Sequence, residues 1–294
     1  MTQIQNHLDM LFVSPPPNTG APLAARQTSG ISSGDSETKW SLWVSGNKND
    51  MKNTLSSTAY TGDAKSFTLG GDYRINKDWV AGISISDDST KLDTSFNQGH
   101  VNYDGQTFSA YVGGQLYPWL RVSLAGGIAD TTAKQSRTDP TLFTTITGTQ
   151  NIDRSFIQTN AVASTWLERW NLSAGLGYLH AKDSSKDFTE SNGVRQAGQT
   201  NNFGQIQLGV KAAYWFDGIM PYVEIAYLND VQRKLPAVVI GQPSPSNDRD
   251  SIRLSVGANV FGKDGWFGGF AANTEQTRSD TRNTSVMLNL GKRF

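Results

Sequence analysis

The sequence predicts an all-β fold: a transmembrane antiparallel up-and-down β-barrel of about twelve strands, preceded by a short N-terminal helix and linker. Three observations predict it. From Trp40 onward, apolar and polar residues alternate with a period of two, as in a sheet with one apolar face and one wet face. Short turns and long polar connections alternate along the chain, as they do in outer-membrane barrels. Aromatic residues flank the short turns, where amphipathic rings suit a membrane interface.

Composition permits this fold and excludes several classes of function. Apolar residues make up 37% of the 294 residues and the mean hydropathy is -0.44, which fits either a soluble β protein or a barrel with a polar lumen. No run approaches the ~18 apolar residues of a transmembrane helix. The absence of cysteine excludes a disulfide scaffold, a thiolate metal site and a cysteine nucleophile. A net charge of zero gives no long-range attraction to nucleic acid, so no nucleic-acid partner is expected.

The N-terminal region differs from the rest of the chain. Residues 3–12 have a helical periodicity that predicts one short amphipathic helix, whose apolar side carries Ile4, Leu8 and Leu11. Residues 14–37 are rich in Pro, Gly, Ser and Ala, and we expect an extended linker without a core of its own. The predicted domains are therefore 1–39, containing helix and linker, and 40–294, the barrel.

Alternation defines the strands. In residues 66–75, Phe67 and Leu69 share the face opposite to Thr68 and Asp72, and similar runs recur to the end of the chain. The predicted strands are 40–47, 66–75, 79–88, 105–117, 119–131, 154–168, 170–182, 202–216, 220–229, 250–261, 266–276 and 284–294.

The connections between these strands predict an orientation. Tight turns are expected at 76–78, 118, 169, 217–219 and 262–265, and long connections at 48–65, 89–104, 132–153, 183–201, 230–249 and 277–283. Because the first connection is long, both ends of the barrel are predicted on the periplasmic side, with the long loops extracellular. The aromatic girdle beside the short turns is expected to contain Tyr73, Trp79, Tyr117, Trp119, Trp170, Trp215, Phe216 and Trp266.

Charged residues on the wet faces are candidates for the lumen. They are Asp72, Arg74, Arg121, Lys211, Glu224 and Arg253. Both signs are present, and buried charges pair or stay hydrated, which favours a network that stiffens the wall. The alternative is contact with a plug or a transiting polypeptide. A barrel of this size has room for one helix or extended segment, and whether residues 1–39 occupy it stays open.

The C-terminal strand carries an expected assembly signal. Apolar residues at alternate positions precede a terminal aromatic: Val286, Leu288, Leu290 and Phe294. This pattern resembles the signal that outer-membrane barrels present to the barrel assembly machinery, and it suits recognition by strand addition. Lys292 departs from the pattern, because an apolar or aromatic residue is usual there, although a lysine can snorkel to a nearby interface.

From about residue 40 to 294 the chain resembles the translocator domain of monomeric autotransporters of Gram-negative bacteria. Residues 67–75 and 79–85 are similar to that family's second and third strands, and residues 220–224 resemble its Pro-Tyr motif. The resemblance implies a monomeric integral outer-membrane barrel, in contact with lipid and lipopolysaccharide, that supports export of a covalently linked upstream passenger. The family usually places a helix in the pore directly before the first strand, whereas here about 27 residues separate the helix from Trp40. No secretory leader is recognisable, so Met1 is expected to begin a fragment.

Two other functions stay open. One is a free-standing narrow channel or surface-binding barrel, and the other is an outer-membrane hydrolase with Asp87, Asp88 and His180 as a water-activating group at the rim. We expect no enzyme and no cofactor. Loop ends usually carry solvated aspartates, and the three histidines lack metal-binding spacing. The G-x-S-x-G match at 30–34 lies in the linker, without the strand and helix that a nucleophile elbow requires.

Overall fold

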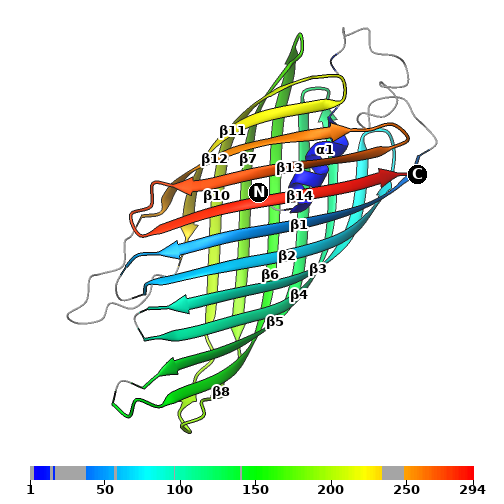
Figure 1. Ribbon diagram of the computed structural model, residues 1–294. Coiled ribbons are helices and arrows are strands. Elements are labelled where there is room, and N and C mark those ends of the chain that lie inside the picture. Colours follow the sequence, from blue (N-terminus) through cyan, green and yellow to red (C-terminus); the bar gives the residue numbers. More distant parts are fainter. Residues whose placement is uncertain are drawn as a thin grey trace.

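A closed barrel of twelve antiparallel strands, with one helix inside, dominates the computed structural model (Figure 1). The structure describes residues 3–13, 16, 38–55, 58–95, 97–139, 141–233 and 248–294. The predicted all-β barrel is thereby confirmed. The linker expected at 14–37, apart from Pro16, and the G-x-S-x-G match at 30–34 lie outside these residues. Within the described ranges, no helix has the length and apolarity needed to span a membrane.

The helix is α1 (Gln3–Phe12), and two short strands, β8 (Phe188–Thr189) and β9 (Arg195–Gln196), pair apart from the barrel. The barrel strands are β1 (Trp40–Asn53), β2 (Tyr60–Arg74), β3 (Trp79–Thr94), β4 (Gly99–Tyr117), β5 (Leu120–Thr138), β6 (Thr145–Leu167), β7 (Trp170–Ser185), β10 (Thr200–Tyr214), β11 (Ile219–Gln232), β12 (Asp250–Phe261), β13 (Trp266–Gln276) and β14 (Thr281–Arg293). Each pairs with its neighbours in sequence, and β1 pairs with β14, so the barrel has no free edge.

The strands separate an apolar outer face from a polar lumen. On β2, Phe67 and Leu69 are 59% and 48% exposed on the outer face, whereas Thr68 and Asp72 are buried toward the lumen. Residues directly opposite each other on paired strands share a face. Leu69 lies opposite Ile85 on β3, and both are exposed. The period of two therefore sorts side chains between the outside and the lumen as the sequence predicts.

Short turns close one end of the barrel, which we call the short-turn end. The side chain of Asn76 accepts hydrogen bonds from the backbone N–H groups of Asp78 and Trp79, both at 2.9 Å, and fixes the turn between β2 and β3. Asp217 and Gly218 have φ of 43° and 101°, the left-handed pair that a two-residue hairpin turn requires. The connections that follow β1, β3, β5, β7 and β13 lie at the opposite end, which we call the long-loop end (Figure 1).

Several strands extend further toward the long-loop end than predicted. β1 continues to Asn53 instead of 47, β2 begins at Tyr60 instead of 66, and β6 begins at Thr145 instead of 154. The outer faces of these extensions are polar, so they lack the apolar and polar alternation by which strands were recognised, but their backbone ladders continue in register. The predicted loop 183–201 likewise contains the hairpin of β8 and β9.

The predicted girdle requires one correction. Most of its aromatic residues are exposed on the outer face near the short turns: Tyr73, Tyr117, Trp119, Trp170, Phe216 and Trp266. Trp215 is instead buried in the lumen, where its ring stacks on Phe261 with centroids 5.7 Å apart. Period-two geometry explains this, because Trp215 faces away from its neighbour Phe216, which is exposed.

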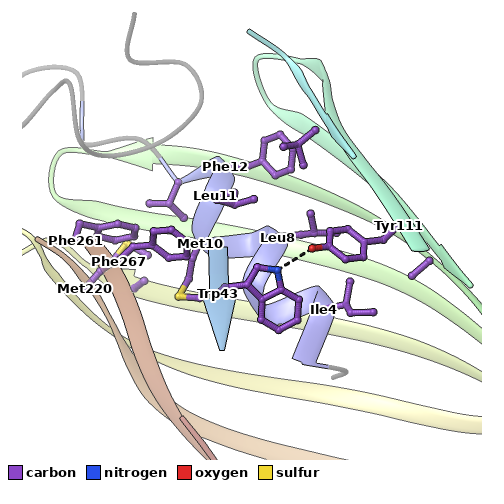
Figure 2. Packing of buried hydrophobic residues seen from close by; sticks show 14 of the residues in the cluster. Ile4, Leu8, Met10, Leu11, Phe12, Trp43, Tyr111, Met220, Phe261 and Phe267 are labelled. Atoms are coloured by element: carbon purple, nitrogen blue, oxygen red, sulfur yellow. Dashed lines mark hydrogen bonds between the residues drawn. The ribbon is translucent and has the colours of Figure 1, made fainter. Parts of the chain in front are cut away.

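The apolar core of the protein lies inside the barrel around α1 (Figure 2). The predicted helix is confirmed, but it is buried on nearly all sides instead of one, because the barrel wall surrounds it. Its apolar side chains pack against residues from the wall near the short-turn end. The main members of this cluster are Ile4, Leu8, Met10, Leu11, Phe12, Trp43, Tyr111, Trp215, Met220, Phe261 and Phe267.

Candidate functional site

The lumen around α1 is the candidate site, and its first anchor is the pair His7 and Asp72. His7 Nε2 lies 2.6 Å from Asp72 Oδ2, and both side chains are 1% exposed. The same carboxylate accepts hydrogen bonds from Ser41 Oγ at 2.6 Å and from the Tyr111 hydroxyl. Trp43 Nε1 donates to the Tyr111 oxygen at 2.8 Å, and the Trp43 ring stacks on His7 at 4.4 Å. A carboxylate on β2 thus holds the middle of α1 through a buried hydrogen-bond network.

Asp9 forms the second anchor on another side of α1. Its carboxylate lies 3.3 Å from Lys211 Nζ on β10 and 3.8 Å from Arg121 Nη2 on β5. Gln5 Nε2 donates to Asp9 Oδ1 at 3.0 Å, and Arg121 Nη1 donates to the Asp9 carbonyl oxygen at 3.3 Å. All three charged side chains are 12% exposed or less, so the anion of the helix compensates two buried cations of the wall.

The start of α1 contacts β2 closer to the long-loop end. Gln3 Nε2 donates to Ser66 Oγ at 2.6 Å, and the Gln3 side-chain oxygen accepts from the Thr68 hydroxyl. Two helical turns later the helix reaches its cluster with Met220 and Phe261, which lie beside short turns. The helix therefore runs from the middle of the lumen toward the short-turn end.

Beyond α1 the lumen opens into a cavity of about 960 Å³, the open cavity, toward the long-loop end. Its walls come from β1 to β7 and β10, with residues from the hairpin of β8 and β9. Ser66, the partner of Gln3, is one of the lining residues. The lumen therefore has two parts, one filled by α1 and one open.

The hairpin of β8 and β9 is fastened to the wall of the open cavity. Glu190 is 6% exposed, and its carboxylate accepts hydrogen bonds from Arg137 Nη2 on β5 at 2.8 Å and from Gln196 Nε2 at 3.1 Å. The Arg137 hydrogen bonds hold the pKa of Glu190 below its usual value. The Ser191 N–H also donates to the Thr147 carbonyl oxygen on β6 at 2.8 Å.

A barrel with a lumenal helix of this kind has a family counterpart. A family model described as the autotransporter beta-domain matches residues 42–273. The chain belongs to this family. It is an integral outer-membrane translocator barrel that supports passenger export, and membership of the autotransporter family implies a passenger linked upstream. Autotransporter translocator domains are not enzymes.

Solved autotransporter domains share the fold at low sequence identity. The translocator domain of NalP from Neisseria meningitidis is 12% identical, with a TM-score of 0.73 over 87% of this chain and 89% of that one. The beta domain of the Bordetella autotransporter BrkA is 13% identical, with a TM-score of 0.73 over 87% and 100%. The transport unit of AIDA-I from Escherichia coli is 13% identical, with a TM-score of 0.67 over 89% and 92%. No curated protein sequence matches this chain significantly.

The predicted lumen charges of this autotransporter barrel fall into three groups. Asp72, Arg121 and Lys211 contact α1, as described above. Glu224 and Arg253 pair with each other at 3.5 Å, both about one tenth exposed. Arg74 is half-buried at the short-turn end of β2, two residues beyond Asp72.

Sequence reasoning did not identify His7 and Asp9 as partners of the wall. The helical periodicity of residues 3–12 placed their helix, but pairing them with Asp72, Arg121 and Lys211 requires the depth and rotation of α1 in the lumen. Two ionisable residues within a short helix that lies ahead of a charged lumen would have been the available signal.

The rim residues considered for hydrolysis do not form a group. Asp88 lines the open cavity and accepts a hydrogen bond from Thr107 Oγ1 at 2.8 Å. Asp87, its neighbour on β3, faces the other way. His180 lies opposite Ile157, which is exposed on the outer face, so His180 is on the outside of the wall. The wall of the barrel separates Asp88 from His180. The three residues therefore do not form the water-activating group that the hydrolase hypothesis requires.

The C-terminal strand of the translocator barrel presents its predicted residues outward. Val286, Leu288 and Leu290 are each at least half exposed on the outer face of β14, and Phe294 is 54% exposed. Lys292, the departure from the usual pattern, holds its Nζ 5.1 Å from the Trp266 ring and 5.5 Å from the Phe294 ring. Cation–π contact thus accommodates the lysine among interface aromatics.

Proposed function

We propose that this translocator barrel spans the outer membrane with its short turns and both barrel ends in the periplasm and its long loops outside the cell. In this orientation the polypeptide preceding α1 leaves through the open cavity, and the linked passenger lies at the cell surface. The proposal assigns α1 to the end of the exported segment, held in the lumen after transport.

The direction of α1 carries this proposal. Gln3 contacts Ser66, and four residues later His7 contacts Asp72, so α1 follows β2 toward the short turn. Chain preceding Gln3 therefore starts at the open cavity, and the nearest way out is the long-loop end. If α1 ran in the opposite direction, the chain that precedes it would leave at the short-turn end, and the passenger would lie in the periplasm.

The packing around α1 favours translocation over a free-standing channel. A channel needs a continuous path, whereas α1 fills the short-turn part of the lumen with apolar side chains and two charged anchors. In this proposal the lumen charges Asp72, Arg121 and Lys211 bind α1. The remaining lumen charges, Glu224, Arg253 and Arg74, stiffen the wall.

The outer surface suggests the remaining partners. The exposed apolar side chains on the outer face of the barrel are proposed to contact lipid and lipopolysaccharide. Val286, Leu288, Leu290 and Phe294 are proposed to be read by the barrel assembly machinery. A closed barrel leaves no strand edge for a second copy, which supports a monomer. We propose no catalytic step for this chain.

Epitope insertion tests the orientation. One epitope is placed between Thr141 and Leu142 at the tip of the β5–β6 hairpin, where Leu142 is 70% exposed, and another between Asp217 and Gly218. On intact cells we expect antibody binding only to the first, and after permeabilisation to both. Binding to the second epitope alone on intact cells would overturn the orientation.

Surface display tests the export function. A secretory leader and a small reporter domain are fused upstream of Met1, and intact cells are treated with protease. We expect the reporter to be digested from outside, whereas the same reporter on a soluble periplasmic carrier stays protected. A protected reporter on a correctly folded barrel contradicts the proposal.

A further inference from the structure

The lumen wall beyond α1 carries an apolar patch where a polar surface would be expected. Three rows of residues lie in register across β6, β7 and β10. The row nearer the long-loop end is Arg154, Asp183 and Asn201, and the next row is Phe156, Ala181 and Phe203. Leu179 extends the apolar surface from the row below. We call Phe156, Leu179, Ala181 and Phe203 the lumen patch.

The lumen patch lines a cavity of its own. This cavity measures about 380 Å³ and is bounded by the patch together with Arg154, Asp183 and Asn201. These three polar residues also line the open cavity, so the two spaces adjoin. Arg154 is held by Asp183 through two hydrogen bonds of 2.6 and 2.7 Å, which keeps the guanidinium off the apolar rings.

The half-buried aromatic rings of the lumen patch are not covered by α1, whose contacts are with other parts of the wall. Apolar surface left in a hydrated lumen favours an apolar partner, since burial removes it from water. A space of this size accepts large side chains.

We infer that the lumen patch is a docking site for an apolar side chain of the polypeptide that immediately precedes Gln3. This inference rests on the proposed function, in which that polypeptide leaves through the open cavity. Gln3 contacts Ser66 on the wall of the open cavity, so the preceding chain begins there. At about 3.3 Å per extended residue, a few residues cross to β6 and β10. Docking holds the end of the exported segment beside the wall after transport.

A single cysteine at Asn201 reports on docking without altering the lumen patch. Residues 1–294 contain no cysteine, so Asn201→Cys gives the barrel one thiol at the border of the patch. A site for a specific protease is inserted directly before Gln3 in the full-length protein, and thiol labelling by a water-soluble maleimide is timed before and after cleavage. We expect labelling to become about tenfold faster once the upstream polypeptide is released.

Two comparisons make the result specific. Thr131→Cys places the thiol on β5, in the open cavity but outside the lumen patch, and its labelling should change little. The double substitution Phe156→Ser and Phe203→Ser, added to Asn201→Cys, should make labelling fast before cleavage as well. Heat-modifiable gel migration verifies that each variant folds.

The outcomes separate this inference from the export proposal. An unchanged Asn201→Cys rate, or an equal change at Thr131→Cys, overturns docking at the patch, and the latter would mean that the segment merely fills the cavity. Loss of surface display of the upstream reporter would overturn the proposed function instead, and it is read in a separate assay.

Discussion

Removing the carboxylate of Asp9 is the sharpest test of how α1 is held. With α1 in place, Asp9→Ala leaves Lys211 and Arg121 as neighbouring cations, 12% and 10% exposed, without their anion. Breaking a buried ion pair by deleting one partner costs about 3–5 kcal/mol, because the remaining charge is uncompensated. Release of α1 would let lumen water hydrate both cations. We therefore expect the equilibrium between docked and released α1 to shift toward release by between roughly 10²-fold and roughly 4 × 10³-fold.

Hydrogen exchange measures this shift directly. Backbone amides of α1 exchange when the helix opens, so their protection reports the free energy of release. The protein is refolded in detergent, and exchange of residues 3–12 is followed by mass spectrometry. Conductance in a planar bilayer gives a second measure, since a released helix unblocks the lumen.

Matched variants decide whether the charge is responsible. Asn6→Ala changes the same helix, but within the described part of the chain the Asn6 side chain makes one hydrogen bond, a long 3.5 Å contact with the Met287 sulfur, so α1 protection should stay near that of the unmodified protein. Adding Lys211→Met to Asp9→Ala removes one stranded cation and should recover part of the protection. If α1 in Asp9→Ala exchanges no faster than in Asn6→Ala, the ionic anchor is not what holds the helix.

Three further predictions concern other parts of the barrel. Gly70→Ala should destabilise the barrel by about 1–3 kcal/mol in urea unfolding, because a new Cβ would lie 2.3 Å from the buried Trp43 ring. Acidification should release the hairpin of β8 and β9, because the Arg137 hydrogen bonds lower the pKa of Glu190. The stabilisation that these hydrogen bonds give is present above the ordinary Glu pKa of about 4.3 and is lost as the pH falls through the lower pKa of the folded protein. Phe294→Ala should reduce assembly in cells, measured by heat-modifiable migration, while refolding in detergent is unaffected.

Each of these has its own control. Gly46→Ala, where nothing lies within 4 Å of the added Cβ, should leave the unfolding midpoint unchanged, and equal midpoints for Gly46→Ala and Gly70→Ala contradict the packing argument. Glu190→Gln should remove the acid-dependent step in hairpin exchange, corrected for intrinsic rates. A Phe294→Ala protein that fails equally in cells and in detergent would have lost barrel stability instead of a recognition signal.

Alternation was sufficient to predict the barrel because hydrocarbon and lumen water impose opposite demands on successive residues of a strand. Strands could not be predicted from the sequence where their two faces no longer differ in this way. The extensions of β1 and β6 have polar outer faces, so their sequences resemble loops although their ladders continue. The ion pair between Arg154 and Asp183 could not be predicted for the same reason. It joins the first residue of one predicted strand to a residue in a predicted loop.

The candidate site was predictable in part for a related reason. Strand parity placed Asp72, Arg121 and Lys211 on the lumen face, since that requires only local pattern. Their partners His7 and Asp9 depend on how α1 is positioned by the rest of the fold. No local pattern in the sequence records that position, because it depends on contacts between α1 and strands that lie far away in the sequence.

The two anchors of α1 explain how a short helix selects one position inside a wide lumen. Apolar contacts are not directional, so the packing of Leu8, Met10 and Leu11 alone would define the rotation of the helix less sharply than hydrogen bonds and ion pairs do. His7 and Asp9 lie two residues apart, about 200° around a helix with 3.6 residues per turn. They therefore meet opposite walls, Asp72 on β2 for one and Lys211 on β10 for the other. A one-residue shift would strand charges on both walls at once, so the ionic contacts define the register while the apolar contacts supply the burial.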